Sequence, residues 1–146
     1  MKSILQSIKT DVLIAPKSQT NSATTTANLD TVDATHGKAD YVRLVLSFAS
    51  EINTNAVGPT ISVLQSDDTV VTNFATILAN RTDEDLTGAR SLTYNIDMRG
   101  KKRYLRLSVT TATTTNDTIT YAATYDLLHE QSPTGTADIA DASVIV

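Results

Sequence analysis

Two alternating runs near the C-terminal end constrain the fold of this chain more than any other feature. In residues 103–111 the apolar side chains are Leu105, Leu107 and Val109, and in residues 118–128 they are Ile119, Tyr121, Ala123 and Tyr125. A period of two places alternate side chains on opposite faces of an extended strand, as in half-buried antiparallel sheets. Because the polar residues 113–117 separate the two runs, we expect the runs to pair as a final hairpin. The turn at residues 99–102 leads into this hairpin.

Other segments repeat this pattern along the chain. Tyr41–Ser50 and Thr60–Gln65 are predicted strands, and Leu92, Tyr94, Ile96 and Met98 alternate in another. Val70–Leu78 fits both a helical stripe and a strand, and we favour a strand because Thr and Val dominate it. Short strands separated by turn signals predict an all-β protein, an antiparallel β-sandwich or jelly-roll-like barrel.

Length and composition bound the organisation and the class of protein. The 146 residues fit one domain, which we divide into an N-terminal arm (1–27), a β-sandwich body (28–130) and a C-terminal tail (131–146). The absence of cysteine excludes a disulfide scaffold and a thiolate metal site, and a net charge of −4 argues against nucleic acid as a partner. The apolar stretches are shorter than the ~20 residues of a membrane helix, so no membrane partner is expected.

The two termini are candidate assembly contacts. Ile4, Leu5, Ile8, Val12 and Leu13 precede Pro16 and a low-complexity run rich in threonine. These residues fit an extended arm that packs on another molecule, and they fit equally well an edge strand at Val12–Ala15 followed by a surface loop. At the other end, the apolar residues are Val144, Ile145 and Val146.

A basic turn is the third candidate contact. Arg99, Lys101, Lys102 and Arg103 place four cations within five residues. They fit docking onto an acidic surface or phosphate, or a solvated turn that discourages edge pairing. A contact between copies, from this turn to the acidic loop Asp83–Asp85, is a further alternative.

The residues that could carry chemistry do not assemble into a motif. His36 and His129 lie in a loop and at the end of a strand, with no nucleophile motif nearby. Asp83, Glu84 and Asp85 precede Gly88 as in a calcium loop, but the twelfth position is Tyr94, which cannot supply the bidentate carboxylate. Asp67 and Asp68 are adjacent and read as a turn. We therefore expect no enzyme activity, no cofactor and no metal.

The order of the segments resembles a known family. Leu29-Asp30-Thr31 precedes the strand Tyr41–Ser50, the segment Ser62–Asp68 and then Asn73–Thr76 follow, and Lys102–Thr110 comes last. Over residues 28–130 this order is similar to that of the small β-sandwich proteins of tailed phages and prophages that accompany the major capsid protein, mostly capsid decoration or cement proteins. The insert at residues 32–40 is longer than the short turn expected at that point.

The resemblance implies a structural protein of the virion. Such a protein is made in the cytoplasm of a host bacterium and binds the outside of the icosahedral head. Its implied partners are the major capsid protein and further copies of itself, as a homotrimer. Two alternatives are another virion component (a tail, head-completion or fibre-associated protein) and a carbohydrate-binding module. The second alternative lacks the usual strip of exposed aromatics, because the chain has no Trp, five Tyr and two Phe.

Overall fold

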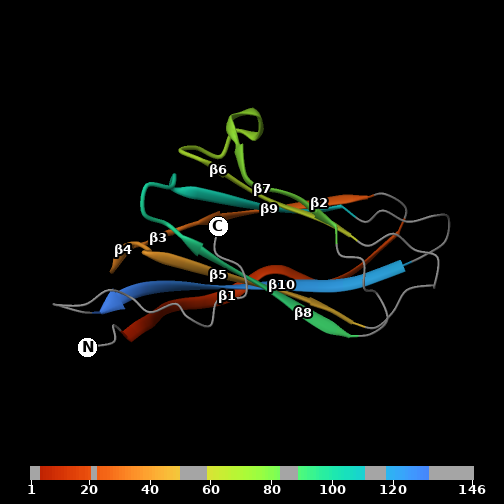
Figure 1. Ribbon diagram of the computed structural model, residues 1–146, viewed down its shortest axis with the longest axis horizontal. Coiled ribbons are helices and arrows are strands. Elements are labelled where there is room, and N and C mark those ends of the chain that lie inside the picture. The colour runs from red at the N-terminus through yellow and green to blue at the C-terminus, as the bar shows by residue number, and fades with distance from the viewer. Residues whose placement is uncertain (1–3, 21–22, 50–58, 83–88, 111–117, 132–146) are drawn as a thin grey trace.

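The alternating segments form two four-stranded antiparallel sheets, which Figure 1 shows as stacked layers. The computed structural model describes residues 4–20, 23–49, 59–82, 89–110 and 118–131. The strands of sheet A lie in the order β1-β10-β5-β8, those of sheet B in the order β2-β9-β6-β7, and β3 and β4 form a small separate ribbon. The elements are β1 (Ile4–Thr20), β2 (Thr24–Asp30), β3 (Val32–Asp33), β4 (Gly37–Lys38), β5 (Tyr41–Phe48), β6 (Thr60–Ser66), the 3-10 turn η1 (Val71–Asn73), β7 (Ala75–Thr82), β8 (Arg90–Asp97), β9 (Tyr104–Thr110) and β10 (Thr118–Gln131).

The pairing of these strands is nested. The first strand, β1, pairs with the last, β10, and β2 pairs with β9; further in, β5 pairs with β8 and β6 with β7. All of these pairs are antiparallel. An eight-stranded sandwich wound in this way is a jelly roll. The prediction of an all-β antiparallel sandwich or jelly roll is therefore confirmed.

The core lies between the sheets and is built from the faces that the alternation predicts. From sheet B, Leu105, Leu107 and Val109 are buried, and from sheet A, Ile119, Tyr121, Ala123 and Tyr125 are buried. The core residues with almost no exposed surface include Val42, Leu44, Leu46, Ile61, Val63, Ile96, Met98 and Leu127. Since burial of apolar surface contributes roughly 25 cal/mol per Å², this shared interior is the main source of stability.

The prediction that the two runs form a final hairpin is wrong. Strand β9 pairs with β2 and β6 in sheet B, whereas β10 pairs with β1 and β5 in sheet A. The two alternating runs therefore face each other across the core. A strand pattern specifies which face is buried, but both a hairpin and a crossing between packed sheets satisfy it.

The separate N-terminal arm is replaced by a strand of the sandwich. Residues 4–20 form β1, the edge strand of sheet A, so the edge-strand alternative holds over a longer range than Val12–Ala15. Strand β2 then spans the proposed boundary at residue 27. Pro16 does not end β1, because it lies at a register shift between Ile14 and Lys17, and an edge strand tolerates a residue without an N–H at such a place.

Three smaller differences concern loops. Val70–Leu78 divides into the turn η1 and the start of β7, and β7 continues to Thr82. The insert at residues 32–40 forms the β3–β4 ribbon, which is anchored where Ala39 N donates to the carbonyl of Thr31 at 2.9 Å. The tail after Gln131, which includes Val144, Ile145 and Val146, lies outside the described residues.

Candidate functional site

The basic turn connects β8 in sheet A to β9 in sheet B, and its two arginines are paired with carboxylates. Arg99 contacts Asp97 with Nε–Oδ1 of 2.9 Å and Nη2–Oδ2 of 2.5 Å. Arg103 contacts Asp30 on β2 with 2.9 Å and 2.6 Å for the same atom pairs. These hydrogen bonds lower the pKa of both carboxyl groups below the usual range. The Arg103–Asp30 pair therefore links the turn to β2, whereas the Arg99–Asp97 pair is local to the end of β8.

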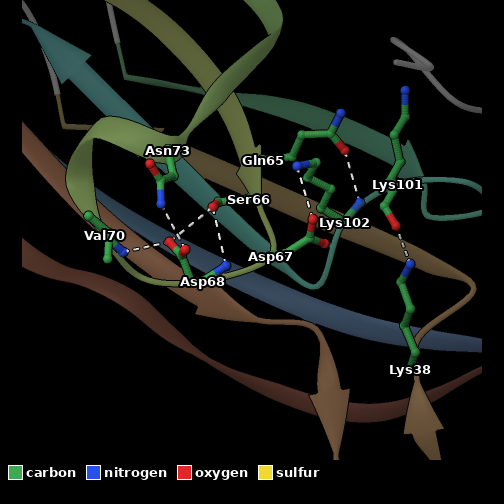
Figure 2. Close-up of polar contacts among 9 residues, drawn as sticks. All are labelled: Lys38, Gln65, Ser66, Asp67, Asp68, Val70, Asn73, Lys101 and Lys102. Atoms are coloured by element: carbon green, nitrogen blue, oxygen red, sulfur yellow. Dashed lines mark hydrogen bonds and ion pairs between the residues drawn. The ribbon is translucent and has the colours of Figure 1, made fainter.

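The lysines of the turn are anchored in the same region (Figure 2). Lys102 Nζ lies 3.0 Å from Asp67 Oδ2, and Lys102 N donates to Gln65 Oε1 at 3.0 Å. Lys38 Nζ donates to the carbonyl oxygen of Lys101. The Lys101 ammonium forms no ion pair with any residue that the structure describes. Three of the four predicted cations thus have internal carboxylate partners, whereas Lys101 has none among the described residues.

A shallow pocket of about 220 Å³ adjoins this turn. Its lining comes from β4 and the β8–β9 connection, where Gly100 adopts a positive φ of 73° and Lys101 N donates to the carbonyl of Met98 at 3.1 Å. The lining residues are Lys38, Ala39, Asp40, Met98, Arg99 and Gly100. Because Asp40 stands beside the two cations and Arg99 is already paired with Asp97, the pocket has no single sign of charge that would select an ion.

The two histidines lie together, although they are far apart in the sequence. His36 Nδ1 contacts Asp33 Oδ1 at 2.9 Å and His129 Nδ1 contacts Asp40 Oδ2 at 2.9 Å, while the ring centroids are 6.2 Å apart. The hydrogen bond from His36 lowers the pKa of Asp33. A Ser-His-Asp type of site needs a nucleophile on the other ring nitrogen of the histidine, and Nε2 of His129 is buried without a hydrogen-bond partner among the residues that the structure describes. The geometry therefore fits a structural role, in which one His–Asp pair stabilises the β3–β4 ribbon and the other attaches the segment after it to β10.

The acidic candidates have structural surroundings where they can be described. Asp67 and Asp68 form a turn, as predicted, in which Asp68 organises the following loop. The proposed calcium ligands Asp83, Glu84 and Asp85 lie outside the described residues. Within residues 4–20, 23–49, 59–82, 89–110 and 118–131, no three His, Asp or Glu side chains are grouped to hold a metal.

The predicted arm residues occupy different positions on β1. Ile8 and Leu13 are partly buried against the core, so they are not available to a partner. Val12 is 55% exposed. Ile4 and Leu5 pair through the backbone with Gln131 and Glu130 of β10. Of the three candidate contact residues whose side chains the structure describes (Ile8, Val12 and Leu13), only Val12 is exposed.

Sequence reasoning missed a second surface, on the outer face of sheet B. Arg106 sits on the polar face of β9, yet it is only 7% exposed because the loop at Val70–Phe74 covers it. The same loop carries Val70 and Val71, which are 53% and 72% exposed. The sequence alternation places Arg106 on the outward, polar face of its strand. It does not indicate that Arg106 is buried, because the loop that covers it comes from elsewhere in the chain.

No relative or membrane signature adds to this geometry. The described part of the chain contains no helix with the length and apolar composition that a bilayer crossing requires. Comparison with models of known protein families, with curated protein sequences and with solved structures gave no match.

Proposed function

We propose that this chain is a bacteriophage structural protein of the capsid decoration or cement type. It would bind the outside of an icosahedral head and stabilise the shell by bridging capsid subunits. The observation that carries the proposal is the jelly-roll sandwich with an apolar interior, because this architecture is common in viral capsid proteins. The resemblance of residues 28–130 to decoration proteins supports the same conclusion.

Two other uses of a jelly roll fit this chain less well. Sugar-binding sandwiches present exposed aromatic rings for stacking, whereas five of the seven aromatic residues here are in the core. The two others, Phe74 and Tyr104, lie under the guanidinium groups of Arg106 and Arg103. Cupin-type sites hold their ligands inside the barrel, whereas the inward side chains of β5, β9 and β10 are apolar.

The mode of attachment follows from the surfaces rather than from an arm. With residues 4–20 hydrogen-bonded to β10, a partner would meet Val12 on the outer face of sheet A and Lys101 in the basic turn. Each such contact is weak by itself. A homotrimer that engages several copies of the major capsid protein would raise the effective concentration of each contact, which is how weak sites give stable decoration.

Binding to heads tests the proposal directly. Heads that lack this protein, prepared from the phage or prophage that encodes it, are mixed with the purified chain and imaged by electron cryomicroscopy. We expect density at symmetry-related positions over the shell and a higher melting temperature of the heads. Density at the tail or at the portal vertex would instead identify another virion component, and absence of binding would refute the proposal.

A charge-reversed pair of variants tests the contact. Lys101→Glu is expected to weaken binding to the heads by reversing the charge that meets the partner, and it breaks no ion pair with a described residue. Lys17→Glu on β1 makes the same change of charge elsewhere and is expected to bind like the wild type. Equal loss with both variants would show that net charge, and not the basic turn, governs attachment.

A further inference from the structure

Three basic residues of the turn have carboxylate partners, whereas the buried Arg106 has none among the described residues. Arg99, Lys102 and Arg103 are solvent-accessible, and each has a carboxylate partner. Arg106 is the most buried of the described basic residues, and its hydrogen bonds to described residues are with neutral groups: Nε donates to Asn28 Oδ1 at 2.8 Å and Nη1 to the carbonyl of Val71 at 3.3 Å. Burying a charge without a countercharge is costly even when hydrogen bonds compensate in part. Among the described residues the Arg106 guanidinium therefore has no countercharge, which makes it electrostatically complementary to an anion.

The aromatic ring beneath Arg106 fixes the direction of the guanidinium. The guanidinium carbon lies 3.8 Å from the centroid of the Phe74 ring, which is a close cation–π contact. A guanidinium has five N–H donors in a planar fork, and the contacts to Asn28 and Val71 use two of them. The fork is thus oriented in advance, and its remaining donors on Nη1 and Nη2 have no hydrogen-bond partner in the described part of the chain, so they could meet a carboxylate.

The loop beside Arg106 is also organised in advance (Figure 2). Asp68 accepts hydrogen bonds from Val70 N at 2.9 Å and from Asn73 Nδ2 at 2.8 Å, and Asp68 N donates to Ser66 Oγ at 3.2 Å. This network holds Val70 and Val71 outward as two adjacent exposed apolar side chains. Since the carbonyl of Val71 contacts Arg106, the apolar pair and the uncompensated cation form one surface.

We propose that Arg106, Val70 and Val71 form a docking surface for a segment of another protein in which an acidic side chain stands next to an apolar one. The carboxylate would accept hydrogen bonds from the remaining N–H donors on Nη1 and Nη2 while the Val71 carbonyl stays in place, and the apolar neighbour would pack on the valines. A charge-assisted hydrogen bond surrounded by apolar contacts is the usual form of an interface hot spot. A phosphate backbone fits less well, because it is recognised by several clustered cations. The surface would act in the same way on a partner other than a capsid protein.

Nuclear magnetic resonance of the labelled full chain tests this surface. The probe is the capped dipeptide acetyl-Glu-Leu-amide, and the matched probe is acetyl-Gln-Leu-amide. We expect the Glu peptide to cause saturable shifts at the Arg106 Nε–H and the methyl groups of Val70 and Val71, and the Gln peptide to bind roughly tenfold more weakly, as loss of a charged hydrogen bond predicts. Equal responses to both peptides, or shifts centred on Arg99 and Arg103, would overturn the proposal.

Variants separate docking from folding. Arg106→Gln should abolish the response, but it also removes contacts to Asn28 and Phe74. Val71→Asp is the second variant, because it keeps the backbone carbonyl while repelling the carboxylate, and it should weaken binding of the Glu peptide by a similar factor. Arg103→Gln removes an exposed arginine and should bind normally. Normal binding by a folded Val71→Asp protein would contradict the proposed surface.

Discussion

The hydroxyl of Tyr121 donates a hydrogen bond of 2.5 Å to Oε1 of Gln19 inside the sandwich. The same oxygen accepts a hydrogen bond of 2.9 Å from Thr25 Oγ1. The three residues belong to β10, β1 and β2, so this amide oxygen joins the two sheets near the connection between β1 and β2. Burial raises the pKa of Tyr121, which keeps the hydroxyl protonated as a donor.

This arrangement predicts an asymmetry between two substitutions. Gln19→Leu leaves the buried Tyr121 hydroxyl without an acceptor, which should cost about 1–3 kcal/mol of the free energy of unfolding. Tyr121→Phe removes only one of two donors to Gln19 and should cost less. Urea denaturation of both variants measures the difference. A larger loss for Tyr121→Phe would show that the Gln19 amide is not the critical group.

Two residues of β1 test whether this strand belongs to the sandwich. Ile14 is 5% exposed and Val12 is 55% exposed, because a register shift between them turns Ile14 toward the core. Ile14→Ala should cost about 2–4 kcal/mol, whereas Val12→Ala should change stability by less than about 0.5 kcal/mol. Thermal or urea unfolding is the measurement. If neither variant lost stability, residues 4–20 would behave as a detached arm.

Acid should destabilise the protein at low pH. The pKa values of Asp30, Asp33, Asp68 and Asp97 are lowered in the folded state, chiefly by hydrogen bonds from Arg103, His36, Asn73 and Arg99 respectively. A folded-state pKa below the unfolded value of about 4 stabilises the fold above that pH, and this contribution disappears as the pH falls through the lowered pKa. The melting temperature should therefore drop below about pH 4. Asp30→Asn should melt at a lower temperature at pH 7 and show a shallower drop.

Two adjacent carboxylates should affect the loop before η1 differently. Asp68→Ala removes the acceptor of the Val70 amide, so hydrogen exchange at this amide should become faster. Asp67→Ala removes only the ion pair to Lys102, so exchange at Val70 should not change. Exchange monitored by nuclear magnetic resonance distinguishes the two. Equal acceleration in both variants would mean that the turn as a whole, rather than Asp68, holds the loop.

The sequence predicts the strands of this protein much better than their partners. Alternation in Tyr41–Phe48 and Tyr104–Thr110 identifies the buried faces correctly, because each side chain's direction follows from strand geometry. The same alternation contains no information about which strand lies alongside. The predicted pairing of β9 with β10 was wrong for this reason, because β10 lies between β1, which is far away in the sequence, and β5.

The candidate contacts show a similar limit. A run of cations marks the basic turn in the sequence, but only the structure shows that Asp30, Asp67 and Asp97 neutralise three of them. Arg106 gave no signal, because its burial comes from a loop that begins some 35 residues earlier in the sequence. Long-range contacts of this kind depend on the whole fold.

The nested strand order has a consequence for how the protein is made. A nascent chain contains β1 and β2 well before their partners β10 and β9 are synthesised. The adjacent strands β6 and β7 can pair early, but β1 and β2 must wait until β9 and β10 have left the ribosome. The long nascent chain therefore spends its synthesis with unpaired strand edges, the state in which chaperones are most needed and aggregation competes most strongly.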